Sequence, residues 1–203
     1  MIGAPSQSGS KLSKGIVMNR RIVCLVSAGI AATMLGAGSL MAGEDHERER
    51  TRFKVRASLV GLQEVPAIST TASGTFKAEV DVEAGTITWY LRYSALEGNV
   101  TQAHVHFGQH SVNGGISYFL CSNLANPPPG TQACPPGPAE LTGLIQAADV
   151  IGPGPVVGPP AAPGQGIEPG SLAEIAAAMR AGVAYANVHT SKWPGGEIRG
   201  QLR

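Results

Sequence analysis

The sequence predicts an all-β fold: an antiparallel Greek-key sandwich or barrel with one short helix before its last two strands. Apolar and polar residues alternate through several short segments, which is the pattern of half-buried strands. Gly and Pro are frequent, at 27 and 15 of 203 residues, and most follow position 120, between those segments. A single segment near the C-terminus has the spacing of an amphipathic helix. Together these observations favour a loop-rich β protein.

The expected strands follow one another from residue 53 onward. Residues 53–59 alternate Phe, Val, Ala and Leu with polar residues, and Pro66, which has no N–H to donate, ends that region. The clearest element is a hairpin, in which residues 75–82 and 86–93 flank the turn Glu83-Ala84-Gly85. The remaining strands are expected at 100–107, 116–121, 141–150, 183–190 and 197–202. Pro/Gly-rich loops are expected around 126–138 and 152–170.

The one expected helix follows Ser171. Ser171 and Glu174 have the spacing of a capping box, in which each side chain bonds the other residue's backbone N–H. Gly182 is expected to end the helix, since glycine readily adopts the left-handed conformation found there. The apolar stripe that would face the core consists of Leu172, Ile175, Ala176 and Met179.

The first 52 residues are not expected to belong to the fold. Residues 18–42 have the three parts of a secretory signal peptide: the basic pair Arg20-Arg21, an apolar run and a small-residue region with cleavage expected near Ala42 or after Ser39. The apolar run is short for a membrane span, which makes an uncleaved anchor the weaker alternative. Translation could start at Met1 or at Met18. If it starts at Met18, residues 1–17 are not part of the protein. Residues 43–52 form a charged leader before a domain at 53–203.

Charge argues against a nucleic-acid partner. The whole chain has 15 basic and 14 acidic residues, but four of the basic residues precede the expected cleavage site. The mature chain is therefore near −3, and it has no basic stripe of the kind that tracks a phosphate backbone. No transmembrane segment is expected after signal cleavage.

Cysteine usage agrees with export. Cys24 would leave with the signal, and Cys121 and Cys134 remain as an even pair in a Pro/Gly-rich stretch. In an oxidising compartment the two are expected to form a disulfide. A metal pair is the alternative, although the spacing is too long for a Cys-x-x-Cys clip. The expected location is periplasmic or extracellular.

Three histidines form the candidate site. His104 and His106 lie two residues apart, so on a strand they project side by side from its polar face. His189 lies on the polar face of its own expected strand, with Tyr185 and Asn187. If the two strands are neighbours, three imidazoles meet, and such a set suits zinc or copper.

A structural role for the same residues is the alternative to a metal site. Glu197 and Arg199 share the polar face of the last expected strand, and Glu64 is placed to pair with Arg199 across the sheet. A His–Glu–Arg network would then tie the last strands together. A catalytic acid/base site is a third interpretation. No Ser/His/Asp nucleophile arrangement or phosphate-binding loop is present, so no catalytic residue is assigned.

Several segments of the chain together carry a family resemblance. They are Leu62–Pro66, Gly74–Phe76, the hairpin with Trp89 and Leu91, Ala103–Gly108, Leu141–Gly143 and the run from Ala181 through Asn187–Thr190 and Pro194 to Gly196–Leu202. In these segments the chain resembles CHRD (chordin-type) domains, over about residues 57–203. The family is named for repeats in chordin, an extracellular antagonist of bone morphogenetic proteins, and single copies occur in bacterial exported proteins. This chain has one copy and none of chordin's cysteine-rich modules, so growth-factor binding is not carried over.

A shorter stretch, His104-Val105-His106-Phe107-Gly108, is similar to the copper-ligand strand of copper–zinc superoxide dismutases. That family's zinc-site histidines and aspartate have no counterpart in order here, and His110 is a further loop histidine without other support. We therefore expect an exported, non-catalytic binding or structural module, and both a structural network and a copper or zinc site stay open as the role of its histidines. Its partner would be a metal ion or an extracytoplasmic protein or polymer. A copper- or zinc-dependent enzyme resembling superoxide dismutase is the second hypothesis.

Overall fold

The computed structural model describes residues 51–125, 127–151 and 164–203. The expected extension at 1–17, the signal peptide at 18–42 with Cys24, and nearly all of the leader at 43–52 lie outside the described residues. Within the described part, no helix has the length and apolarity needed to cross a membrane.

Eight antiparallel strands form one sheet in the order β5-β4-β7-β8-β1-β2-β3-β6. The all-β prediction is therefore confirmed, including one helix before the last two strands. The elements are β1 (Arg52–Val60), the 3₁₀ turn η1 (Gly61–Gln63), β2 (Ser73–Asp81), β3 (Thr86–Ser94), β4 (Val100–Phe107), β5 (Gly115–Ser122), β6 (Ala139–Gln146), the 3₁₀ turn η2 (Ala147–Asp149), α2 (Leu172–Arg180), β7 (Ala184–Thr190) and β8 (Ile198–Gln201).

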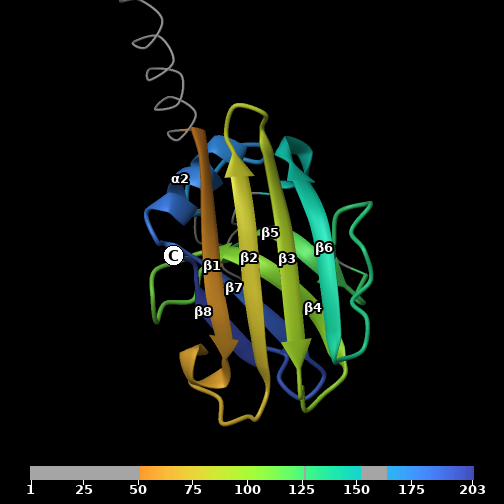
Figure 1. Cartoon of the computed structure of the whole chain (residues 1–203). Coiled ribbons are helices and arrows are strands. Elements are labelled where there is room, and N and C mark those ends of the chain that lie inside the picture. Colours follow the sequence, from red (N-terminus) through yellow and green to blue (C-terminus); the bar gives the residue numbers. More distant parts are fainter. Residues whose placement is uncertain (1–50, 126, 152–163) are drawn as a thin grey trace, which may run out of the picture. The chain divides into compact units, whose positions relative to one another are not determined.

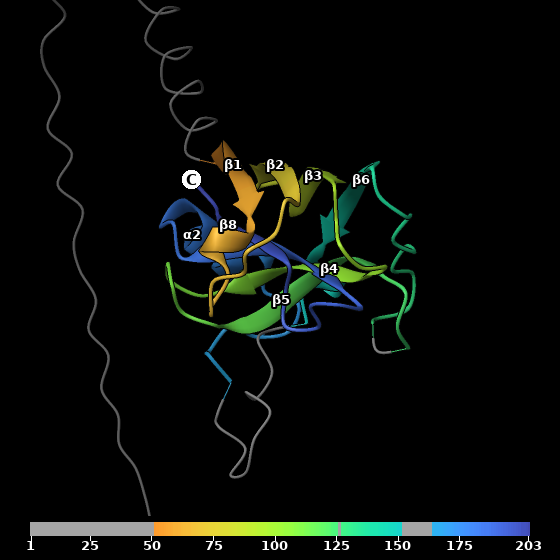
Figure 2. The same ribbon diagram turned by 90° about the horizontal axis from the view of Figure 1, so that it is seen from below.

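The sheet folds over on itself into two layers. β1, β2, β3 and β6 form one layer, and β8, β7, β4 and β5 form the other, as Figures 1 and 2 show from two directions. The layers are joined where β1 meets β8, through the single register pair Val60–Arg199. This nearly barrel-shaped arrangement leaves β5 and β6 at the two ends of the strand order.

The core lies between the layers because each strand turns its apolar residues inward. In β1 the inward residues are Val55, Ala57 and Leu59, and Phe76, Ala78 and Val80 of β2 lie beside them. The predicted hairpin is confirmed: Asp81 and Thr86 are its last register pair, and Gly85 has a φ of 64°, which only glycine adopts without cost.

The helix α2 packs its predicted stripe into the same core. Leu172, Ile175, Ala176 and Met179 are all buried, and Gly182 ends the helix with a φ of 71°. The predicted capping box is wrong. The Ser171 side chain makes no cap hydrogen bond, and the Glu174 carboxylate instead accepts the backbone N–H of Glu168.

Two further segments bear on the sequence expectations. The extended segment expected to reach Val150 ends as a strand at Gln146, because the Asp149 side chain accepts the Gln146 backbone N–H and closes the 3₁₀ turn η2. The expected disulfide between Cys121 and Cys134 is present, with Cα atoms 5.0 Å apart. It ties β5 to the Pro-rich segment before β6.

Candidate functional site

β4 and β7 are neighbours, and this adjacency brings the three predicted histidines together. In the register, His104 lies opposite Asn187, His106 opposite Tyr185, and His189 opposite Gln102. One ligand nitrogen from each ring can be chosen so that all lie within 4.8 Å of one another. Among the described residues this is the one group of three or more His, Cys, Asp or Glu side chains so arranged.

The histidine face is buried, which the strand alternation did not predict. His104 is fully buried, and His106 and His189 are each 7 % exposed. Every residue of β7 is buried, so this strand is covered on both faces. The cover includes the loop between β4 and β5, which the Arg199 guanidinium holds by donating to the backbone carbonyls of Gln109 and Val112.

His189 presents one free nitrogen to the centre of the cluster. Its Nδ1 lies 2.8 Å from the Pro194 carbonyl oxygen, which can only accept, so Nδ1 carries the proton. Nε2 then carries a lone pair and no proton, and this atom is buried with no hydrogen-bond partner. Burial lowers the pKa of His189 below its usual value, so the ring stays neutral.

His106 is held in place by contacts on several sides. Its Nδ1 lies 2.9 Å from the Gly114 carbonyl oxygen and its Nε2 lies 3.1 Å from Asn187 Oδ1. Burial, the largest effect, lowers the pKa of His106 to about 4. A neutral ring has one N–H, so it cannot donate to both oxygens at once. With the proton at Nδ1, the Nε2 lone pair faces the Asn187 amide.

His104 has no hydrogen-bond partner at either ring nitrogen. Its ring meets Phe119 edge to face at 4.6 Å and lies 4.8 Å from the His189 ring, centroid to centroid. Burial lowers its pKa well below the usual value, and the neighbouring His189 and His106 lower it further, while the nearby Asn187 side chain opposes this shift. Each unpaired buried polar atom costs about 1–3 kcal/mol, so two in one ring need an explanation.

Tyr185 and Arg199 form a stack behind His106. The Tyr185 ring is parallel to the imidazole, and the Arg199 guanidinium lies 3.4 Å from the Tyr185 ring centroid in a cation–π contact. Arg199 also donates to Asn113 Oδ1. Arg199 is almost fully buried, and these contacts supply the partners that a buried charge requires.

Glu64 lies near this stack but does not form the predicted pair with Arg199. The guanidinium makes its hydrogen bonds to the β4–β5 loop instead, and its charge acts on Glu64 only at longer range. Burial is the dominant effect and raises the pKa of Glu64 to about 7, while the Arg199 charge opposes this rise. One carboxylate oxygen, Oε1, is buried without a partner.

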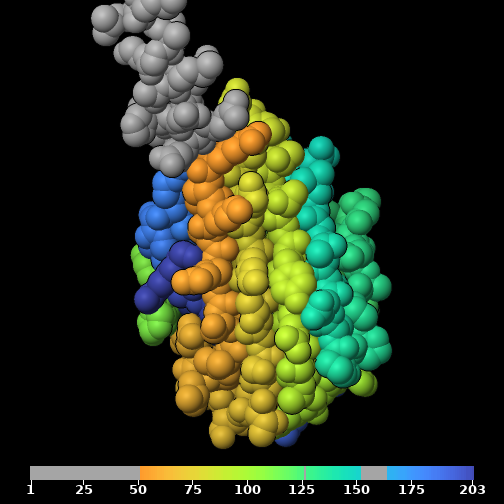
Figure 3. Space-filling model, in the orientation of Figure 1, coloured from red at the N-terminus to blue at the C-terminus, as the bar shows by residue number. Residues whose placement is uncertain are grey.

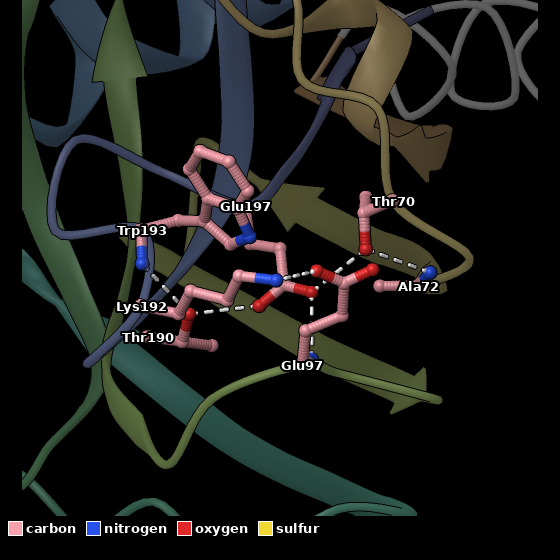
Figure 4. A network of polar contacts seen from close by, with 7 residues as sticks. All are labelled: Thr70, Ala72, Glu97, Thr190, Lys192, Trp193 and Glu197. Carbon is pink, nitrogen blue, oxygen red and sulfur yellow. Dashed lines mark hydrogen bonds and ion pairs between the residues drawn. The ribbon is translucent and has the colours of Figure 1, made fainter.

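The hydrogen bonds of Glu197 lie away from the histidines, on the side of Thr70 and Thr190. The Glu197 carboxylate accepts the hydroxyl groups of Thr70 and Thr190, at 2.9 and 2.7 Å, and the backbone N–H of Glu97 at 2.8 Å (Figure 4). Glu97 in turn pairs with Lys192. Because Glu197 lies just before β8 and turns toward Thr190, it is satisfied without contacting a histidine.

Several residues of the site were not assigned a role from sequence. Tyr185 and Asn187 share the His189 face by simple alternation, and that period-2 signal could have placed them beside His106. The carbonyls of Gly114 and Pro194 carry no side-chain signal at all. His110 lies apart from the cluster, in the β4–β5 loop, where its Nδ1 lies 2.8 Å from the Ser111 hydroxyl.

Comparison with known proteins gives one match. The family model described as CHRD domain matches residues 55–202, which is nearly the whole of the described part of the chain. No curated protein and no solved structure matches.

Proposed function

Because the chain belongs to the CHRD domain family, we propose that it is an exported, non-catalytic module that holds a copper or zinc ion through His104, His106 and His189. One observation carries the metal assignment: three buried imidazoles from two adjacent strands bring one ring nitrogen each within 4.8 Å of the others, and His104 and His189 have ring nitrogens without a partner. Neutral imidazole is a preferred ligand of both metals.

The hydrogen bonds around the cluster support this assignment. Metal-ligating histidines usually donate their other N–H to a carbonyl or carboxylate, which fixes the ring orientation and the tautomer. The Pro194 and Gly114 carbonyls occupy that position for His189 and His106. A purely structural network explains these two bonds equally well, but it leaves both nitrogens of His104 without a partner.

The distances fit an ion after a small adjustment. With metal–nitrogen bonds of about 2.0–2.1 Å, the nitrogens of a tetrahedral site lie roughly 3.4 Å apart. The present separations, within 4.8 Å, therefore close by roughly an ångström through side-chain rotation. Two ring nitrogens, Nε2 of His189 and either nitrogen of His104, break no hydrogen bond when they bind the ion.

Burial favours a structural or binding role for the ion over catalysis. A catalytic metal keeps a coordination position open to substrate. Here the three ligands are buried under the loops that carry Gly114 and Pro194. The enzyme hypothesis based on superoxide dismutase has no support, because the described residues hold no second cluster for a zinc subsite.

Export is the second part of the proposal. It rests on the signal-peptide pattern at 18–42 and on the disulfide between Cys121 and Cys134, since disulfides persist mainly in oxidising compartments. N-terminal sequencing of the protein recovered from outside the cytoplasm tests it. A start between Leu40 and Glu44 is expected, and recovery of the uncleaved chain from the cytoplasm would contradict it.

The metal site is tested by elemental analysis of the purified protein after loading with Zn²⁺ or Cu²⁺ and dialysis. One ion per chain is expected for the native protein, none for His106→Ala, and an unchanged content for His110→Ala, whose ring lies outside the cluster. Thermal melts of the three proteins check folding, and the metal should raise the melting temperature of the native protein and of His110→Ala. Absence of both bound metal and a thermal shift in the native protein would refute the site.

A further inference from the structure

The outer face of the β1–β2–β3 layer has a concentration of positive charge, although the chain as a whole is nearly neutral. Residues 51–203 contain nine Lys and Arg and ten Asp and Glu. Five of the nine cations are exposed on these three strands. They are Arg52, Lys54, Arg56, Lys77 and Arg92. Figure 3 shows the outer face of this layer.

Three of these five cations are compensated by a neighbouring carboxylate. Arg52 pairs with Asp81 at 2.6 Å, Lys54 with Glu79 at 3.5 Å, and Arg92 with Glu140 at 3.7 Å. Arg56 and Lys77 are in none of the ion pairs found in the described residues. Lys77 has only a cation–π contact, with its Nζ 5.8 Å from the Tyr90 ring centroid.

The two uncompensated cations lie directly opposite each other. Arg56 and Lys77 are register partners in the β1–β2 ladder, and like charges in that position destabilise a sheet. Arg203 adds a third cation beside them, because its backbone exchanges two hydrogen bonds with Arg56, at 2.8 and 3.1 Å. The fold therefore holds three cations together without a carboxylate partner from the described side chains.

A groove crosses the sheet at this row of residues. Two adjoining depressions, of about 610 and 510 Å³, share Arg56, Lys77 and Arg203 in their walls. The first extends toward Thr88 and Tyr90, and the second extends toward Gln63 and His110. Cations, a tyrosine ring and hydroxyl or amide groups thus line the two depressions, and the one carboxylate among them, Glu79, is paired with Lys54.

We propose that this groove binds an acidic polysaccharide, with the uncompensated cations receiving its carboxylates. Guanidinium and ammonium groups form charge-assisted hydrogen bonds with carboxylates, and the neutral polar side chains can bond sugar hydroxyls. The balance of charge favours this polymer over nucleic acid or polyphosphate. A domain with more acidic than basic residues repels a densely charged phosphate chain, whereas three local cations suit a sparser one.

The proposal stands on residues separate from the histidine cluster, so either can fail without the other. Its test is calorimetric titration of the purified protein with polygalacturonate, and with the methyl-esterified polymer in which the carboxylates are neutral. Binding of the first and not the second is expected, weakening as salt is added.

The variant Arg56→Gln/Lys77→Gln should bind about tenfold more weakly, since two exposed charge contacts are lost. The matched control is Lys54→Gln/Arg92→Gln, which removes two charges from the same face but from compensated positions. It should lose no more than about threefold, through long-range attraction alone. Because the first variant relieves repulsion, its melting temperature should be equal to or above that of the native protein.

Three results would overturn the proposal. These are equal binding of the esterified polymer, equal losses in the two double variants, and tighter binding of single-stranded RNA or polyphosphate than of polygalacturonate. The last result would assign the groove to phosphate polymers instead.

Discussion

The ring of Tyr185 lies flat against the ring of His106, with the two planes 2° apart and the centroids separated by 4.6 Å. The tyrosine hydroxyl lies within hydrogen-bond distance of the Gly114 backbone, and Gly114 also accepts from His106. The Tyr185 ring and the Gly114 carbonyl therefore together set the orientation of the His106 imidazole.

Replacing Tyr185 tests whether this stack positions a metal ligand. Tyr185→Leu removes the flat contact and should weaken metal affinity about tenfold or more, the usual cost of losing a residue that orients a ligand. Tyr185→Phe keeps the ring and should lose much less. Affinities are measured by competition with a chromophoric chelator, and equal losses in the two variants would contradict a positioning role.

The stability of the metal-free protein should rise between pH 5 and pH 7. His106 has a folded pKa of about 4 against 6.5 for the free side chain, so over this range the unfolded chain binds the proton and the native protein does not. Stability is therefore lost as pH falls below about 6.5, by about 2 kcal/mol at pH 5 for this one histidine. His104 and His189 act in the same direction. Because Glu64 titrates in the opposite direction over the same range, the effect is measured by urea unfolding of the Glu64→Gln variant in the presence of a chelator. A pH-independent free energy of unfolding in that variant would refute it.

Glu64→Gln should remove an opposing pH dependence. The pKa of Glu64 is raised to about 7 from 4.5, so the native protein binds the proton more tightly and loses stability as pH rises through this window. The neutral amide avoids that loss. The free energy of unfolding of the variant relative to the native protein should increase by about 2 kcal/mol from pH 5 to pH 7. Glu83→Gln, at an exposed turn, is the control and should show no such change.

Thr190→Val should destabilise the protein by about 2–3 kcal/mol. The Thr190 hydroxyl donates to the fully buried Glu197 carboxylate, and valine has the same shape but no hydroxyl, which leaves a charged oxygen with one donor fewer. Thr190→Ser keeps the donor and should cost less. Denaturant midpoints compare the two, and a larger loss in the serine variant would show that packing, not the hydrogen bond, dominates.

The parts of the fold that follow from local pattern were predictable from sequence. The 83–85 hairpin, the stripe of α2 and the shared face of His104 and His106 depend only on periods of 2 and 3.6 residues and on turn chemistry. The three histidines can meet only if β4 and β7 are neighbours, which alternation within each strand does not determine, and the two strands do pair.

The burial of the site was not predictable, because it depends on loops. Alternation places a histidine on the polar face of a strand, but it cannot say that the 108–114 loop, held by Arg199, covers that face. For the same reason the sequence could not separate Glu197 from the histidines. That separation follows from a bond to Thr70, which is 127 residues away in the chain.

The strand order determines when, during synthesis, the sheet can be completed. β7 and β8 fill the space between β4 and β1, so the sheet stays in two pieces until the C-terminal segment from Ala184 onward has been synthesised. His189 arrives with that segment, and the non-local pairings that it completes form slowly. The N-terminal strands therefore leave the ribosome well before their final partners exist. The eight-stranded sheet therefore cannot be complete before the last two strands have been synthesised, even where earlier hairpins have already paired.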